Sequence, residues 1–177
     1  TGVEVFTGYG MSETCPLLTL TYNKYSEANK TLEDDINHRI KAGMPVPLVD
    51  LKINSDNGSN NSGNPGEIVV RSPWLTSCYA KDEEASHKLW NDGWLHTGDV
   101  GYLDELNFLT ISDRIKDVIK SGGEWVSSIE IERLITLCEG VNEVAVVGII
   151  DEKWGERPVA WIKASELNSE IIKTHLE

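Results

Sequence analysis

The chain has 177 residues and a formal net charge of -13 at pH 7, with 40% hydrophobic and 25% charged residues. A chain of this length can bury a core of its own, as one ordinary domain or two small ones. The acidic excess argues against a nucleic-acid-binding surface, because such surfaces gather Lys and Arg to displace phosphate counterions.

The cysteines of the chain, Cys15, Cys78 and Cys138, are odd in number and widely spaced. This pattern predicts neither a disulfide framework nor a Cys-x-x-Cys metal site, and it favours a reducing cytoplasm. No apolar run approaches the ~18–20 residues that span a bilayer, so we expect no transmembrane segment.

Both ends of the chain have the pattern of interrupted elements. Residues 1–6 resemble a strand already under way, and a helix that starts at about Leu167 runs to the last residue. The chain also lacks an initiator Met. We therefore expect a fragment of a longer protein.

The first part of the chain is predicted to be mainly β. Residues 48–54 and 66–71 alternate with a period of two, as half-buried strands do. The polar run between them, residues 55–65, predicts a surface hairpin loop. The further elements expected here are a helix over 82–90, with acidic residues at its N-terminal end, and strands over 94–103 and 108–111.

The second part of the chain is predicted to be smaller and of the α+β type. Ser127 and Glu130 form a capping box, and an apolar stripe then predicts an amphipathic helix that ends near Gly140. That stripe consists of Ile131, Leu134, Ile135 and Cys138. Residues 141–150 are rich in β-branched side chains, which is typical of a buried strand, and residues 159–163 are expected to pair with them.

Residues 113–125 combine alternating charges with a Gly-Gly pair and Trp125. Arg114, Lys116 and Lys120 lie close together in an otherwise acidic chain, which predicts a local anion site at a joint whose backbone moves. A solvated charged strand edge explains the same pattern.

Residues 9–13, Tyr-Gly-Met-Ser-Glu, have the composition of a nucleotide-facing loop. A purine can stack on the ring of Tyr9, the hydroxyl of Ser12 can bond a phosphate, and the carboxylate of Glu13 can hold Mg²⁺. The alternative is a strand-to-helix turn in which Ser12 caps the following helix.

Thr97-Gly98-Asp99 places a carboxylate after a glycine bend, where it can accept both hydroxyls of a ribose. An ordinary turn is the alternative. Trp125 belongs to the predicted anion site at residues 113–125, and its alternative interpretation is a core tryptophan. Trp154 is interpreted mainly as a structural residue. The histidines have no metal-ligand spacing: His38, His87, His96 and His175.

Taken in this order, the motifs at 9–13, 97–99 and 113–125 resemble those of the adenylate-forming enzymes. The form Ser-Gly-Gly-Glu-Trp at 121–125 is most similar to the fatty acyl-CoA synthetases of that family, and the resemblance extends from about residue 7 to 162.

The resemblance implies an α+β fold in two domains. Residues 1–112 would be the end of a large AMP-binding domain, mainly β, with a small β-barrel-like subdomain. Residues 113–177 would be the first part of a small, mobile α+β C-terminal domain, truncated here, with a hinge near 113–116.

The resemblance also implies the roles of individual residues. Tyr9 would stack on adenine, Ser12 would approach the α-phosphate, and Glu13 would hold Mg²⁺. Most family members have Thr where this chain has Ser12, which keeps the hydroxyl. The remaining nucleotide-binding residues would be Gly8 and Gly10 through their backbone, Asp99 and Arg114 at the ribose, the hinge residue Lys116, and Lys120 and Trp125.

The implied activity uses ATP, Mg²⁺ and CoA to convert a fatty or other carboxylic acid into an acyl-adenylate and then a thioester. The sequence leaves the oligomeric state open, and a homodimer is one of the states it allows. The family's Gly-rich phosphate loop, acyl pocket and late catalytic lysine are not among these residues, so we expect the isolated chain to be inactive.

Other functions also agree with the sequence. The chain could be a non-catalytic nucleotide-binding or interaction module. Within the enzyme class, the alternatives are an aryl or short-chain acid ligase, or transfer to a carrier-protein thiol.

Overall fold

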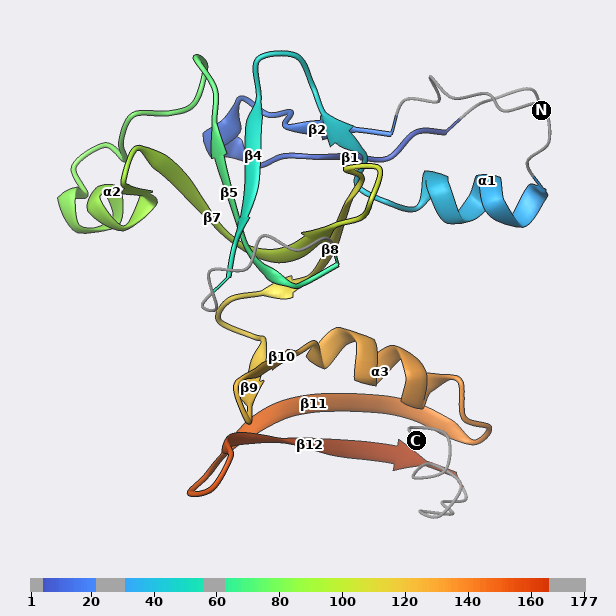
Figure 1. The fold of residues 1–177 in the computed structure, drawn as a ribbon. Coiled ribbons are helices and arrows are strands. Elements are labelled where there is room, and N and C mark those ends of the chain that lie inside the picture. The colour runs from blue at the N-terminus through green and yellow to red at the C-terminus, as the bar shows by residue number, and fades with distance from the viewer. Residues whose placement is uncertain (1–4, 22–30, 56–62, 166–177) are drawn as a thin grey trace. The chain divides into compact units, whose positions relative to one another are not determined.

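The computed structural model describes residues 5–21, 31–55 and 63–165. The chain divides into two compact units, Thr1–Ile111 and Ser112–Glu177 (Figure 1). The first unit is mainly β, and the second combines a sheet with a helix, so the expected fold class is confirmed. Assignment of the units to a large domain and a mobile C-terminal domain stays a prediction.

The first unit contains a small antiparallel sheet with the strand order β1-β2-β3. Its strands are β1 Gly8–Tyr9, β2 Thr19–Leu20 and β3 Met44–Pro45. A short 3-10 helix, η1 Ser12–Thr14, lies between β1 and β2, and the helix α1 Leu32–Arg39 precedes β3.

A larger antiparallel sheet completes the first unit, with the order β4-β5-β7-β6 and β8 paired with β7. Its elements are β4 Asp50–Asn54, β5 Gly66–Arg71, α2 Glu83–Leu89, β6 Trp90–Asn91, β7 Trp94–Leu103 and β8 Leu109–Arg114. The residues of β8 from Ser112 onward belong to the second unit. The core cluster joins Tyr9 of β1 and Leu18 to residues of the larger sheet, among them Ile68, Leu95 and Leu109.

Several predicted elements of the first unit are confirmed. The strands over 66–71 and 94–103 have the expected bounds. The helix over 82–90 is α2, whose N-cap Asp82 accepts a hydrogen bond from the amide of Ala85. Strand β8 extends to Arg114 and so enters the charged segment. The predicted loop lies largely outside the described residues.

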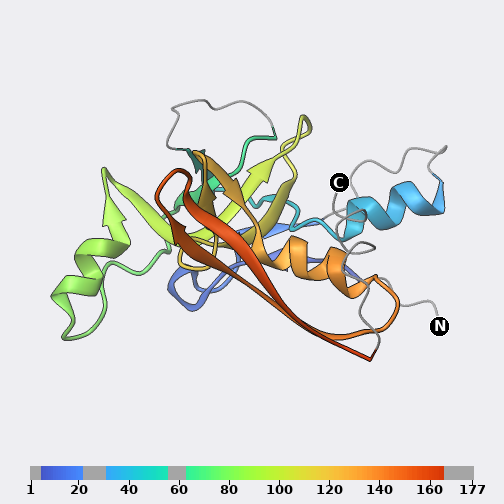
Figure 2. The same ribbon diagram turned by 90° about the horizontal axis from the view of Figure 1, so that it is seen from below.

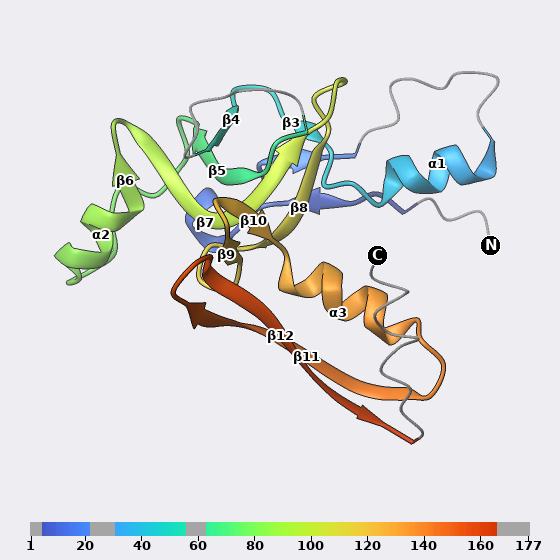
Figure 3. The same cartoon turned by 60° about the horizontal axis from the view of Figure 1, so that its bottom comes forward.

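The second unit is a four-stranded sheet with the order β10-β9-β12-β11, covered by one helix. In Figures 2 and 3 the helix lies along the long hairpin of the two C-terminal strands. The elements are β9 Ile119–Ser121, β10 Glu124–Val126, α3 Ser128–Thr136, β11 Val141–Asp151 and β12 Gly155–Ala164. Ile119, Ile135 and Val146 form the centre of its core.

The prediction of a buried strand over 141–150 is wrong in its burial. Because side chains alternate along a strand, Val147 and Ile149 lie on the face of β11 opposite Val146 and the core, and both are exposed. Ile150, near the end of β11, is 89% exposed. The partner strand β12 also begins at Gly155, earlier than expected, because the connecting turn is short.

Two predictions at the chain ends have a mixed outcome. Val5 and Phe6 are not part of a strand, because the first strand begins at Gly8. Residues 1–4 and the predicted helix from Leu167 lie outside the described residues.

Asp104 fixes the turn between β7 and β8. Its carboxylate accepts hydrogen bonds from the amides of Leu106 and Phe108 and from Nζ of Lys41, at 2.8, 2.9 and 2.7 Å. Burial alone would raise the pKa of Asp104, but these three donors outweigh it, so the pKa lies below its ordinary value of 3.8.

We predict that Asp104→Asn lowers the free energy of unfolding by about 1 kcal/mol at neutral pH, because it removes the charge that Lys41 pairs with. A carboxylate whose pKa is lower in the folded state stabilises the fold at pH values above its unfolded-state pKa. This stabilisation is lost as the pH falls through the folded-state pKa. The difference between variant and wild type should therefore disappear at a pH well below 3.8. Urea unfolding at both pH values measures it, and an unchanged difference in acid would contradict the prediction.

Candidate functional site

The segment after β1 folds tightly on itself around Gly10. A Cβ added to Gly10 would lie 1.6 Å from the carbonyl oxygen of Pro16, so only glycine fits there. The buried hydroxyl of Thr14 donates to the carbonyl oxygens of Met11 and Pro16, at 2.9 and 3.0 Å. Met11 is the N-cap of η1 and Ser12 is exposed within it, so Ser12 is not a helix cap.

Tyr9 and Asp99 meet although 90 positions separate them in the chain. The hydroxyl of Tyr9 donates a 2.8 Å hydrogen bond to Oδ2 of Asp99. Tyr9 is only 9% exposed and belongs to the core cluster, and its hydroxyl is the atom that meets the carboxylate. The structure thus brings together two residues that the sequence predicts to belong to one nucleotide site.

A bulge in β7 aims the carboxylate of Asp99. The pairs Glu67 with Val100 and Val69 with His96 leave Thr97-Gly98-Asp99 without regular partners on β5. Gly98 adopts a φ of +72°, which bends the strand at that point.

Glu67 and Ile68 of β5 fix this bulge in place. The Glu67 carboxylate accepts from the amide of Gly98 at 3.2 Å and lies 2.6 Å from Nδ1 of His96. The Thr97 hydroxyl donates to the carbonyl oxygen of Ile68 at 2.8 Å. These hydrogen bonds hold the bulge in one conformation, and an ordinary open turn would lack them.

Glu13 is held by a residue that the sequence did not single out. The hydroxyl of Tyr79 donates a 2.6 Å hydrogen bond to Oε1 of Glu13. This bond raises the pKa of the Tyr79 phenol above its ordinary value of 10.0, with smaller contributions from burial and from the charges of Glu13 and Asp82.

The single carboxylate of Glu13 fits Mg²⁺ better than it fits a metal ion whose ligands all come from the protein. Among the described residues, no group of three or more His, Cys, Asp or Glu side chains could hold a metal ion. Mg²⁺ is commonly bound by one or two carboxylates and completes its shell with phosphate oxygens and water. A single carboxylate such as Glu13 is sufficient for that arrangement.

In the second unit, Asp113 ties the end of β8 to the start of α3. Its side chain is buried, with 3% of the residue exposed. Oδ2 accepts from the amide and hydroxyl of Ser128 at 2.9 and 3.1 Å and from the hydroxyl of Ser127 at 3.2 Å. Ser127 is the N-cap that the sequence predicted, and its hydroxyl accepts from the amide of Glu130.

The charged residues between Asp113 and Ser127 project from a β9–β10 hairpin and the loop before it. Lys120 and Trp125 are partners across the hairpin, and Nζ of Lys120 lies 4.4 Å from the ring centroid of Trp125. The turn is made by Gly122 and Gly123, both at positive φ. Trp125 is half-buried and so is not a fully buried core residue.

Lys116, the expected hinge residue, is exposed beside Asp117. Their charged atoms are 3.9 Å apart, and both side chains are largely in solvent, so the pair contributes little to stability. Arg114 and Lys120 are also exposed. Trp154 packs against Gly122, whose amide donates to its carbonyl oxygen at 2.8 Å, which agrees with a structural role.

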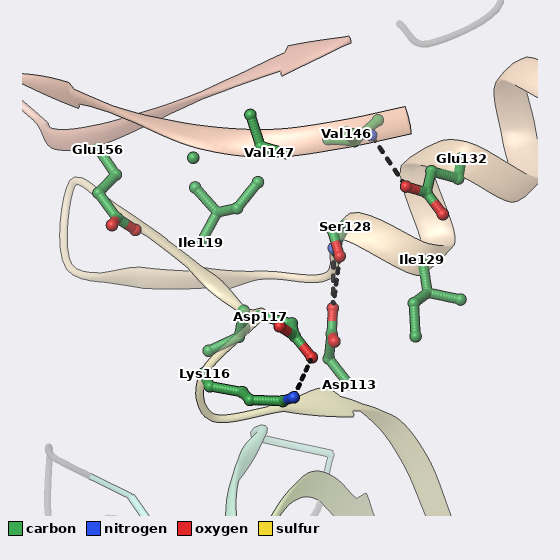
Figure 4. Close-up of a pocket in the computed structure, with 12 residues that line it drawn as sticks. Asp113, Lys116, Asp117, Ile119, Ser128, Ile129, Glu132, Val146, Val147 and Glu156 are labelled. Atoms are coloured by element: carbon green, nitrogen blue, oxygen red, sulfur yellow. Dashed lines mark hydrogen bonds and ion pairs between the residues drawn. The ribbon is translucent and has the colours of Figure 1, made fainter. Parts of the chain in front are cut away.

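A cavity of about 430 Å³ lies beside Lys116 within the second unit (Figure 4). Its charged lining consists of Lys116 and the carboxylates of Asp113, Asp117, Glu132 and Glu156. Glu132 accepts from the amide of Val146 and Glu156 from that of Lys120, both at 2.8 Å, and Asp113 binds Ser128. Asp113, Glu132 and Glu156 therefore stabilise the fold, and the excess of carboxylates disfavours an anionic ligand in this cavity.

The structure thus pairs Tyr9 with Asp99 in the first unit and Lys120 with Trp125 in the second. The nucleotide-binding and metal-binding roles of the predicted residues stay predictions. Sequence reasoning missed Tyr79, Glu67 and the structural role of Asp113. None of the three had a local sequence signal, because each acts through a contact between residues that are well separated in the chain.

Two family models together match most of the chain. A model described as AMP-binding enzyme matches residues 1–80, and one described as AMP-binding enzyme C-terminal domain matches residues 130–177.

Two curated relatives act on different kinds of acid. A long-chain-fatty-acid–CoA ligase of Thermus thermophilus is 37% identical over 97% of this chain. A 2-succinylbenzoate–CoA ligase of Oceanobacillus iheyensis is 40% identical over 99% of it. The chain spans 34% of each relative, about a third of their length.

Solved structures of the o-succinylbenzoate CoA synthetase of Bacillus subtilis are also similar. The complex with its acyl-adenylate intermediate matches with a TM-score of 0.78 and 32% identity, over 99% of this chain and 34% of that one. The complex with ATP and magnesium ion matches with a TM-score of 0.76 and 31% identity, over 98% and 34%. In the described part of this chain, no helix is long and apolar enough to cross a membrane.

We predict that Asp113→Ala lowers the free energy of unfolding by about 2–4 kcal/mol, because it leaves the buried amide and hydroxyl of Ser128 without their acceptor. Asp117→Ala is the matched control, and we expect a change within about 0.5 kcal/mol because that carboxylate is exposed. Urea unfolding followed by tryptophan fluorescence measures both. Equal effects of the two substitutions would contradict the role of Asp113.

Proposed function

Because this chain belongs to the AMP-binding family of adenylate-forming enzymes, we propose that the whole protein is an ATP-dependent acid–CoA ligase. The observation that carries the proposal is the pairing of Tyr9 with Asp99, which unites two ordered family motifs at one place. The reaction would use Mg²⁺ and would take place in the cytoplasm, in keeping with free cysteines at positions 15, 78 and 138.

The proposed reaction has two steps. First, a carboxylate oxygen of the acid attacks the α-phosphorus of ATP, the bond to the bridging oxygen breaks, and pyrophosphate leaves. Then the sulfur of CoA attacks the acyl carbonyl carbon, AMP leaves, and the thiol proton passes to solvent. Catalysis of such steps depends mainly on positioning and on stabilisation of charge.

The residues of the first unit would bind the nucleotide and its metal. Asp99, aimed by the β7 bulge, would accept the ribose hydroxyls. Tyr9 would lie at the adenine end, and the exposed hydroxyl of Ser12 would approach the α-phosphate beside the backbone of Gly8 and Gly10. Glu13 would hold Mg²⁺, which supplies charge neutralisation at the phosphates when bound.

The residues of the second unit would serve the exchange between the two steps. Arg114 would contact the ribose, and Lys116 would act as the hinge. Lys120 and Trp125, held together by their contact across the hairpin, would lie against the nucleotide in one conformation. Alternation between two arrangements suits a scheme in which one face serves adenylation and another admits the thiol.

We propose a fatty acid as the substrate, supported by the Ser-Gly-Gly-Glu-Trp form and by the long-chain relative. An aryl acid is the second candidate, because relatives named for 2-succinylbenzoate match this chain equally well.

The test is ATP–pyrophosphate exchange by the full-length protein with a panel of acids. We expect fatty acids to drive exchange. Asp99→Asn should raise the KM for ATP by about tenfold, because a charge-assisted hydrogen bond is worth roughly 1.5–3 kcal/mol. Asp50→Asn, on an exposed position of β4, is the matched control and should leave the KM unchanged. Exchange with aryl acids alone would overturn the fatty acid assignment, and exchange with no acid would overturn the ligase activity.

For the isolated 177-residue chain we predict no exchange above background, because none of its residues was matched to the phosphate loop or the late lysine that the resemblance implies. That lysine would stabilise the charge that develops at the α-phosphate, which neighbouring residues do not easily replace. The same assay with the full-length protein in parallel measures this. Turnover by the isolated chain would show that these elements are dispensable.

A further inference from the structure

Tyr79 is bound to Glu13 by a contact between distant parts of the chain. The two residues are 66 positions apart, and the 2.6 Å bond from Oη to Oε1 has the length of a charge-assisted O–H···O⁻ bond. Such bonds are roughly twice as strong as neutral ones. Tyr79 lies in the connection between β5 and α2, whereas Glu13 lies in η1.

The segment that carries Tyr79 is itself anchored on both sides. The amide of Thr76 donates to the main-chain carbonyl oxygen of Glu13 at 2.9 Å. The carbonyl oxygen of Thr76 accepts from the indole of Trp90 at 3.1 Å, and the amide of Tyr79 donates to the hydroxyl of Ser86 at 2.9 Å. One segment therefore holds Glu13 by both its backbone and its carboxylate.

A tyrosine is a neutral donor, and this decides what the contact does to the carboxylate. A Lys or Arg in the same place would neutralise the negative charge and compete with a metal ion. Tyr79 restricts the orientation of the carboxylate and occupies Oε1, while the charge remains available at Oε2. Partners that orient a metal ligand in this way typically affect metal affinity by about 10–100-fold.

We propose that Tyr79 is a positioning residue that orients Glu13 for the Mg²⁺ of the Mg²⁺–ATP complex. This rests on the proposed function of Glu13 as the metal-binding carboxylate. Tyr79 itself touches neither the metal nor the nucleotide in this scheme, and acts only through Glu13.

The experiment is calorimetric titration of the full-length protein with Mg²⁺–ATP and, separately, with AMP in the presence of a chelator. Tyr79→Phe should weaken Mg²⁺–ATP binding by about tenfold and leave AMP binding without metal unchanged. Tyr102→Phe removes a hydroxyl from β7, away from this contact, and should change neither affinity. Mn²⁺ in place of Mg²⁺ gives a second readout, the relaxation of water protons by the bound ion.

Glu13→Gln separates failure of this proposal from failure of the proposed function. If Glu13→Gln weakens Mg²⁺–ATP binding and Tyr79→Phe does not, Tyr79 has no positioning role. If neither substitution changes it, Glu13 is not the metal-binding residue and both proposals are overturned. Equal losses of Mg²⁺–ATP and AMP binding in Tyr79→Phe would show a merely structural role.

Discussion

The buried carboxylate of Asp113 is the constraint on which the second unit depends. A buried charge is costly unless it is fully hydrogen-bonded, and here the amide and hydroxyls at the start of α3 supply the donors. The helix dipole favours a negative charge at that end. Because Asp113 and Ser128 are joined, the charged segment between them is a loop closed at its base. Its cations project into solvent from a backbone whose two ends are fixed, and Lys116 lies just after the fixed point.

In the first unit, the carboxylate of Asp99 is also held in place by neighbouring residues. Asp99 is turned out of β7 by a bulge that Glu67 and Ile68 hold from the neighbouring strand. Its side chain then meets the hydroxyl of Tyr9, whose ring is fixed in the core. The carboxylate of Asp99 is thus placed by the sheet and the core together, which gives it a defined direction without a covalent or metal constraint.

The sequence predicted those parts of the structure that have local signals. Strands with a clear period of two were found at nearly their observed bounds, and the helix capped by Ser127 was found at its observed start, because alternation and capping act within a few residues. That helix ends at Thr136, earlier than the expected end near Gly140. Strands β1, β2 and β3 were missed because two residues show no period. Burial of β11 was predicted wrongly, since composition does not tell how many faces of a strand are covered. Residue-level resemblance predicted site roles for Tyr9, Glu13 and Asp99, but no local pattern connects Tyr79 to Glu13 across 66 positions.

The candidate site residues have uncharged partners, in a chain with a net charge of -13. At long range such a chain repels an anionic nucleotide, so the proposed nucleotide binding would depend on groups that lie close to the ligand. Glu13 and Asp99 receive hydrogen bonds from tyrosine hydroxyls, which orient them without cancelling their charge. In the other unit, Lys120 lies over the ring of Trp125, a contact that likewise preserves its charge.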